Sequence, residues 1–192
     1  VVVNYARSAD KAQEVVAAIE AQGGKALAVQ ADMSQVADIR RLFQETVDYF
    51  GHLDILVNNA GIGKFSLLAE VTEEEFDAVF AINAKGVCFA LQEAARRMAD
   101  GGRIVNISSS VTVSGAPGTG LIGGSKGAVE QFTLTAAKEL EGRGITANIV
   151  SPGITKTEAF RNLPPDLQAQ MAQGAKVGQP ADIADVVACE DT

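Results

Sequence analysis

The chain has 192 residues and a net charge of −8, from 24 acidic and 16 basic residues. This acidic balance provides no long-range attraction for nucleic acid or for an anionic membrane surface, so neither is an expected partner and any phosphate must be held by local groups. Hydrophobic residues make up 47% and aromatic residues only 5%, which favours an α/β fold in one domain, with thin strands packed under helices of small side chains.

Five short runs of apolar or β-branched residues alternate along the chain with segments of helical spacing. Each run predicts a strand, and strands joined by helical crossovers run parallel. We therefore expect a doubly wound parallel sheet. The predicted strands lie at residues 1–5, 25–31, 53–59, 103–109 and 145–151.

Three of the predicted helices have recognisable ends. Ser34 is expected to cap the helix that follows the second strand. Thr72 and Glu75 form a predicted capping box at the start of the next helix. A further helix is expected to begin near Ser125, after a glycine-rich stretch, and to end at Gly142.

Turn-forming and polar residues follow all five predicted strands. In doubly wound sheets, ligands bind beyond the carboxyl ends of the strands, where loop amides and helix N-termini converge. Each loop alone has an ordinary explanation as a turn, but together they predict one site. The residues are Tyr5, Arg7 and Ser8 after the first strand, Asp32 after the second, Asn58, Asn59 and Gly61 after the third, Ser109 after the fourth, and Pro152 and Gly153 after the fifth.

Some of these residues suit a dinucleotide. No acidic residue follows the first strand to bind a ribose 2′-hydroxyl, whereas Arg7 and Ser8 can bind a 2′-phosphate, which favours NADP over NAD. The alternative is a solvated arginine and a helix cap. Asp32 can accept a hydrogen bond from an adenine amino group, or it only helps Ser34 to cap a helix. The stretch NNAG at 58–61 allows a flat ligand to approach the backbone closely, or it is a plain turn.

Several other chemistries are disfavoured. Ser125 precedes Lys126, which is the wrong order for a P-loop. Cys88 and Cys189 lack metal-ligand spacing, so we expect reduced, packed thiols and no metal. His52 is the only histidine, so no catalytic triad can be built. No apolar run approaches the ~18 residues of a membrane span and no signal peptide is recognisable, so the protein is expected to be cytoplasmic.

The sequence resembles the short-chain dehydrogenase/reductase family, and within it the 3-oxoacyl-[acyl-carrier-protein] reductase-like members. The motifs that carry the resemblance are VVVNYARS, ADMS, LDILVNNAG, the Asn of FAINAKG, IVNISS, SKGAVE, SPGITKT and GQPADIADVV. The resemblance implies one Rossmann-like NAD(P)-binding domain over residues 1–192, acting on a ketone or a secondary alcohol. It also implies a homodimer or homotetramer formed through the helices near 73–99 and 124–141, and a substrate lid at 158–179.

The resemblance also assigns roles in catalysis. It implies that Ser109 binds the substrate oxygen, Asn83 anchors a water relay and Lys126 holds the nicotinamide ribose. Strand alternation turns the two serines beside Ser109 to the opposite face. The family's proton-donating tyrosine stands four residues before the lysine, on the same helix face, and here Ile122 occupies that position. General acid catalysis is worth ~10²–10⁴ in rate, so residual activity at best is expected.

The implied cofactor contacts extend over most of the chain. The resemblance places them at Tyr5, Arg7, Ser8, Asp32, Met33, Asn59, Ala60, Gly61, Lys126, Pro152, Gly153, Thr155 and Thr157.

Relative to the family, the first strand with its glycine-rich turn and the last strand are absent. The first strand is central in the 3-2-1-4-5-6 order, so we expect the first two strands here to lose a neighbour and the chain to be partial at both ends.

Two functions remain open. One is a fragment or variant of an NADP(H)-dependent short-chain oxidoreductase. The other is a non-catalytic dinucleotide-binding or subunit-partner protein, in which Ile122 is an accepted packing residue.

Overall fold

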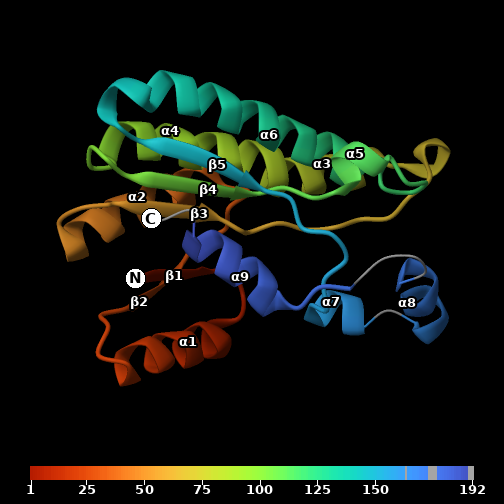
Figure 1. Cartoon of the computed structure of the whole chain (residues 1–192), viewed down its shortest axis with the longest axis horizontal. Coiled ribbons are helices and arrows are strands. Elements are labelled where there is room, and N and C mark those ends of the chain that lie inside the picture. Colours follow the sequence, from red (N-terminus) through yellow and green to blue (C-terminus); the bar gives the residue numbers. More distant parts are fainter. Residues whose placement is uncertain (163, 173–176, 190–192) are drawn as a thin grey trace.

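A computed structural model describes residues 1–162, 164–172 and 177–189. All five predicted strands are present, and all their pairings are parallel, which confirms the α/β class (Figure 1). The strands are β1 (Val2–Tyr5), β2 (Leu27–Gln30), β3 (Ile55–Asn58), β4 (Arg103–Ile107) and β5 (Thr146–Val150).

The strands form two sheets. One has the order β1-β2, with Val2 opposite Leu27, and the other has the order β3-β4-β5, with Arg103 between Ile55 and Thr146. Among the described residues, no strand lies between β1 and β3. This split is the outcome expected for a chain that lacks the central strand of the 3-2-1-4-5-6 order.

The helices cover both sheets (Figure 1). Helices α3, α4 and α6 lie on one side of β3-β4-β5, α9 lies on the other side, and α1 lies beyond β1-β2 at the far end of the molecule. In the part of the chain that the structure describes, no helix combines the length and apolar character needed to cross a bilayer. The helices are α1 (Ala9–Ala21), α2 (Val36–Phe50), α3 (Glu73–Phe80), α4 (Val87–Arg97), α5 (Val111–Ser114), α6 (Gly120–Leu140), α7 (Glu158–Arg161), α8 (Pro165–Ala172) and α9 (Pro180–Cys189).

The start of α2 differs from the predicted one. Ser34 does not cap it, because α2 begins at Val36 and the residue before it, Gln35, makes no side-chain cap. Instead, the Ser34 N–H donates to Asp32 Oδ1 at 2.8 Å, and the Asp32 N–H donates to Asp38 Oδ2 at 2.9 Å. The short aspartate side chain closes a local turn that uses the Ser34 backbone, so the helix starts later.

At α3 the predicted capping residue is in place. Thr72 Oγ1 accepts the Glu75 N–H at 3.2 Å, which confirms Thr72 as the cap. The Glu75 carboxylate accepts from Ser66 Oγ at 2.8 Å and pairs with Lys64 at 3.2 Å, and these contacts, together with a hydrogen bond from the Thr72 backbone, lower the pKa of Glu75. It therefore fastens the loop that precedes α3.

Helix α6 begins at Gly120, not near Ser125, and is followed by a 3₁₀ turn at Glu141–Arg143. Most of the glycine-rich stretch is thus helical, against its low intrinsic propensity. At Gly120 an added Cβ would lie 2.8 Å from Leu68 Cδ2. Leu68 is largely exposed, so its side chain can move aside and this contact does not by itself require a glycine.

The main core lies between α2, α4, α6 and the larger sheet. Ile104 on the middle strand β4 is fully buried, and a smaller cluster fills the space between β2 and α2. The main cluster includes Ile39, Phe43, Val87, Ala90, Leu91, Met98, Ile104, Val129 and Ile145. This packing fixes the edge of β3-β4-β5 at which the polar loops gather.

Two glycine-to-alanine variants test the packing around the polar loops. At buried Gly86 an added Cβ would lie 2.5 Å from the Met33 carbonyl oxygen, so Gly86→Ala should lower the free energy of unfolding by about 1–3 kcal/mol. Gly127, within α6, has no atom within 4 Å of such a Cβ, so Gly127→Ala should raise it by about 0.5–1 kcal/mol. Urea denaturation measures both, and equal effects of the two variants would contradict this packing.

Candidate active site and cofactor site

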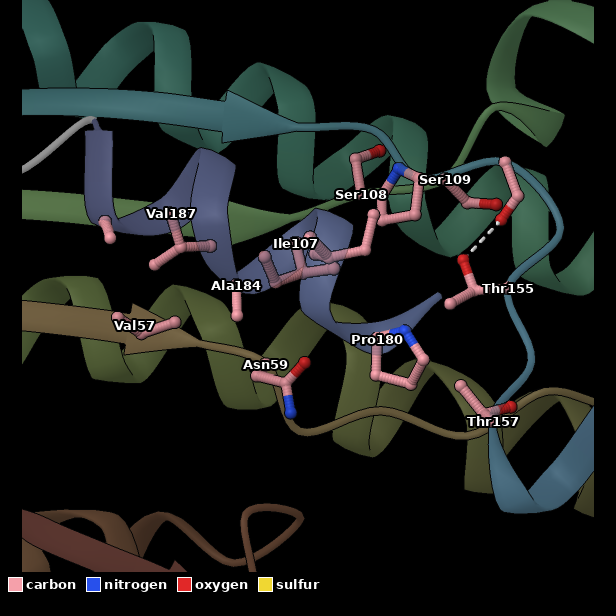
Figure 2. Close-up of a pocket in the computed structure, with 14 residues that line it drawn as sticks. Val57, Asn59, Ile107, Ser108, Ser109, Thr155, Thr157, Pro180, Ala184 and Val187 are labelled. Atoms are coloured by element: carbon pink, nitrogen blue, oxygen red, sulfur yellow. Dashed lines mark hydrogen bonds between the residues drawn. The ribbon is translucent and has the colours of Figure 1, made fainter. Parts of the chain in front are cut away.

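Two cavities lie at the carboxyl ends of the strands. The first has a volume of about 810 Å³ and lies between the ends of β3-β4-β5 and α9, whose Pro180, Ala184 and Val187 line it (Figure 2). Six predicted site residues line this cavity: Asn59, Ser109, Pro152, Gly153, Thr155 and Thr157.

The second cavity has a volume of about 940 Å³ and lies beside β1 and the start of α1. Because Asn59 lines the first cavity and its neighbour Ala60 the second, the two adjoin at this loop. Every predicted cofactor contact apart from Lys126 thus lines one of the two cavities. The second cavity is lined by Tyr5, Arg7, Ser8, Asp32, Met33, Ala60 and Gly61.

The start of α1 presents polar groups to the second cavity. Ser8 is the residue before α1, but its hydroxyl makes no cap, so the helix-cap alternative for this side chain is not realised. Lys11 lines the same cavity, and its Nζ lies 2.6 Å from Glu158 Oε2 on α7. Hydrogen bonding to Glu158 raises the pKa of Lys11, and hydrogen bonding to Lys11 lowers the pKa of Glu158. No sequence pattern indicated this contact, which joins residues far apart in the chain.

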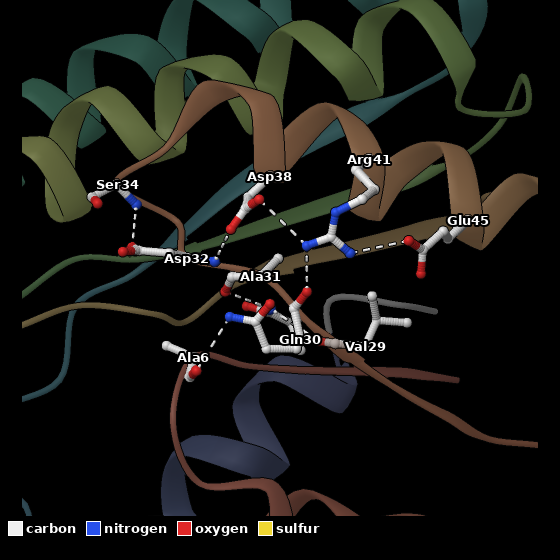
Figure 3. Close-up of polar contacts among 10 residues, drawn as sticks. Ala6, Val29, Gln30, Ala31, Asp32, Ser34, Asp38, Arg41 and Glu45 are labelled. Carbon is white, nitrogen blue, oxygen red and sulfur yellow. Dashed lines mark hydrogen bonds and ion pairs between the residues drawn. The ribbon is translucent and has the colours of Figure 1, made fainter.

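Asp32 forms part of a small polar network at the end of β2 (Figure 3). Its Oδ1 is used in the turn with Ser34, and its N–H is the largest cause of the lowered pKa of Asp38. Arg41 on α2 donates to the Gln30 carbonyl oxygen at 2.7 Å. Asp32 therefore closes a turn with Ser34 and does not help Ser34 to cap α2, and contact with an adenine stays a prediction.

Asn83 is fully buried in a π-helical segment, Ala81–Gly86, between α3 and α4. Its Oδ1 accepts from Ile62 N at 2.9 Å, and its Nδ2 donates to Ile62 O at 2.9 Å and to Ser125 Oγ at 3.0 Å. The side chain thus joins the loop after β3 to α6. Sequence reasoning missed Ser125 as its partner, although the serine stands next to Lys126.

Lys126 is buried on α6, and its Nζ donates to the Ile107 carbonyl oxygen at 2.6 Å. Burial lowers the pKa of Lys126 because it disfavours the charged amine. Gly61 lies close to this group: an added Cβ would be 3.1 Å from Asn83 Oδ1 and 3.5 Å from Lys126 Nζ. The absence of a side chain at Gly61 therefore keeps the space beside both groups open.

Ile122 contacts the same loop. A Cβ at Gly63 would lie 3.4 Å from Ile122 Cδ1, and Ser125 Oγ donates to the Ile122 carbonyl oxygen at 3.0 Å. Since Ile122 stands one helical turn before Lys126 on α6, both side chains pack beside the loop of residues 61–63. Ile122 thus places an apolar side chain at the position where the resemblance predicts a tyrosine.

Two adjacent serines at the end of β4 have different surroundings. The Ser108 hydroxyl is buried and donates to Glu130 Oε1 at 2.6 Å. Ser109 Oγ accepts the Val111 N–H at 3.4 Å, and both serines line the first cavity (Figure 2). The sequence did not identify Glu130, although it stands one turn after Lys126 in SKGAVE.

Residues 163 and 173–176 of the expected lid lie outside the described residues, and α7 and α8 form within the rest. In the described ranges, no three His, Cys, Asp or Glu side chains come together as metal ligands. Within the described residues, neither Cys88 nor Cys189 is joined in a disulfide.

Parallel strands joined by helical crossovers, with two adjoining cavities beyond their carboxyl ends, are typical of a Rossmann-like protein. The family model for short chain dehydrogenases matches residues 1–168. The chain therefore belongs to the short-chain dehydrogenase/reductase family.

Relatives of known name support this assignment. The chain is 40% identical over 189 residues to a 3-oxoacyl-[acyl-carrier-protein] reductase of Synechocystis sp., an alignment that covers 97% of this chain and 76% of the relative. A short chain dehydrogenase from Burkholderia cenocepacia, solved in complex with NADP, is 39% identical with a TM-score of 0.91 over 97% of this chain and 78% of that one. An angucycline C-6 ketoreductase with bound NADP is 40% identical with a TM-score of 0.92 over 100% of this chain and 78% of that one.

The buried amine makes stability depend on pH. The folded-state pKa of Lys126 is lowered, so between this pKa and the unfolded value of about 10.5 the unfolded chain binds more protons, and raising the pH stabilises the fold. We expect the free energy of unfolding of the unmodified protein, minus that of Lys126→Met, to increase as the pH rises from 7 towards 10. Urea denaturation at each pH measures this difference, and a constant difference would contradict the burial of a charged amine.

Proposed function

We propose that this protein is an NADP(H)-dependent oxidoreductase that interconverts a ketone and a secondary alcohol. The single observation that carries the proposal is the gathering of twelve predicted cofactor contacts, from four separate loops, around two adjoining cavities. The NADP held by two structural relatives, one of them titled a ketoreductase, supports both the cofactor and the substrate class.

Residues of this chain suit NADP(H) at two places, the second cavity and the loop where the two cavities adjoin. In the second cavity, Arg7 and the Ser8 hydroxyl bind the 2′-phosphate, because no acidic side chain stands in the connection between β1 and α1. At the loop where the cavities adjoin, the open space beside Gly61 lets a ribose approach Lys126 Nζ. Bound NADPH supplies the hydride for ketone reduction.

Three side chains serve the substrate end. Ser109 at the first cavity donates a hydrogen bond to the substrate oxygen, and Lys126 holds a positive charge close to it. Asn83 holds the loop after β3 in a fixed position against α6 through its three hydrogen bonds. Ile122 has no proton to give, so we expect slow turnover.

A second function is non-catalytic dinucleotide binding. The observation that favours it is the packing of Ile122 against the loop at Gly63, inside a hydrogen-bonded network that is complete without a tyrosine. Binding of NADPH without turnover of any ketone would support this function, and turnover by the unmodified chain would exclude it.

The assembly proposed for this protein is a homodimer or homotetramer in the cytoplasm. Phe76 on α3 and Leu134 on α6 are exposed apolar side chains on the helices through which we expect copies to pair. Cys88 and Cys189, which form no disulfide in the part of the chain that the structure describes, suit a reducing compartment.

The proposed cofactor preference rests on Arg7. Arg7→Ala removes the cation at the expected 2′-phosphate, so the Kd for NADPH should rise about 10–100-fold while that for NADH stays unchanged. Fluorescence titration of each cofactor measures this. Lys138→Ala, which removes one exposed positive charge far along α6, is the control. Equal weakening for NADPH and NADH would contradict a phosphate contact at Arg7.

The proton donor is tested at Ile122. If the mechanism is right, Ile122→Tyr should raise the kcat for NADPH-dependent ketone reduction by ~10²–10⁴, the usual worth of a general acid. Ile122→Phe supplies the ring without the hydroxyl and is the matched control. A tyrosine variant no faster than the phenylalanine variant would rule the mechanism out.

A further inference from the structure

Glu130 links α6 to the segment that carries Ser109. It stands on α6 one helical turn after Lys126, and its Oε1 accepts hydrogen bonds from two hydroxyl groups. Ser108 Oγ donates at 2.6 Å and Thr112 Oγ1 lies at 2.9 Å. The two donors stand immediately before Ser109 and three residues after it, so one carboxylate oxygen holds both sides of the serine.

The segment needs such an anchor. Up to Ser110 it is held by the sheet edge, where the Ser108 N–H donates to Val150 O at 2.7 Å and the Ser110 N–H to Pro152 O at 2.9 Å. Beyond that point the chain continues as α5, which has four residues. A single turn of helix has little stability of its own, so the contact between Thr112 and Glu130 fastens α5 to the longer helix.

The same contact reaches the Ser109 backbone. Thr112 Oγ1 lies 3.0 Å from the Ser109 carbonyl oxygen and 2.9 Å from Glu130 Oε1. Its single hydrogen is shared between these two acceptors, so a shift of the Glu130 carboxylate alters the contact that Thr112 makes with Ser109. Within the described part of the chain, Glu130 forms no ion pair, so these hydroxyl contacts account for its role.

We propose that Glu130 is a positioning residue that fixes Ser109 relative to Lys126. Both Lys126 and Glu130 belong to α6, so the helix that carries the buried amine also sets the place of the serine hydroxyl. This inference rests on the proposed function, in which Ser109 binds the substrate oxygen. Small misplacements of catalytic groups, of about 1 Å, lower rates by up to about 10²-fold.

Glu130→Ala and Glu130→Gln test the proposal by kinetics. Glu130→Ala should lower the kcat for ketone reduction about 10–100-fold, in the unmodified chain and in Ile122→Tyr, with the Kd for NADPH changed by less than about twofold. The Gln carbonyl oxygen accepts from both hydroxyls, so Glu130→Gln should restore kcat to within about threefold. Glu139→Ala, at an exposed position of α6, is the control for loss of one carboxylate.

Hydrogen exchange of the backbone amides tests the positioning without any substrate. Amides of residues 108–114 should exchange faster in Glu130→Ala than in Glu130→Gln or the control, while those of β1-β2 stay unchanged.

The two tests separate the inference from the function on which it rests. Unchanged exchange, or ketone reduction by Glu130→Ala as fast as by the unmodified protein, would overturn the role of Glu130. Faster exchange in Glu130→Ala together with no ketone reduction by any variant would support the role of Glu130 in holding the segment and would contradict the proposed reaction. Loss of kcat, cofactor binding and melting temperature together would mean general damage to the fold, and the positioning role would then be abandoned.

Discussion

The site depends on the buried amide of Asn83. Its three hydrogen bonds join the backbone of Ile62 to Ser125 of α6, so the loop after β3 and the helix that carries Lys126 have one relative position. Each such bond adds only about 1 kcal/mol, but a buried amide left without partners costs about 1–3 kcal/mol per group. Moving the loop away would therefore cost more free energy than the hydrogen bonds themselves contribute, because it would leave the buried amide without partners. The π-helical segment Ala81–Gly86 aims the side chain at the loop.

Behind this amide, a second buried polar chain sets the register of the sheet. Asn58 Nδ2 on β3 donates to Asn106 Oδ1 on β4 at 2.7 Å, and Asn106 Nδ2 donates to Thr133 Oγ1 on α6 at 2.7 Å. A slip of β3 by one residue would turn Asn58 to the other face and leave Asn106 unsatisfied. The strand, its neighbour and the helix are thus fixed together, and the loops that follow them inherit this arrangement.

The fold and most of the candidate site residues were predictable, because they follow from the hydrophobic periodicity of each segment and from the order of strands and helices along the chain. Alternation of strands and helices fixed the parallel pairing, and parallel strands bring their carboxyl ends to one edge, so residues as distant as Tyr5 and Thr157 could be assigned to one region. The helix starts were less predictable, since α6 begins at Gly120 within a stretch of low helix propensity and an Asp32 turn replaced the Ser34 cap. The partners Glu130 and Ser125 depend on contacts between side chains distant in sequence, for which the chain carries no local signal.

The burial of Lys126 bears on which function the site performs. A desolvated ammonium without a carboxylate partner is costly, and desolvation is the cause of its lowered pKa. One carbonyl oxygen, that of Ile107, accepts from Nζ, while a lysine amine can donate three hydrogen bonds. If this part of α6, which includes Ile122, served only for packing, an apolar residue at position 126 would stabilise the fold more than a buried lysine does. A ribose hydroxyl beside Gly61 would supply a further acceptor, so the energetics of this amine favour cofactor binding whether or not a proton is transferred.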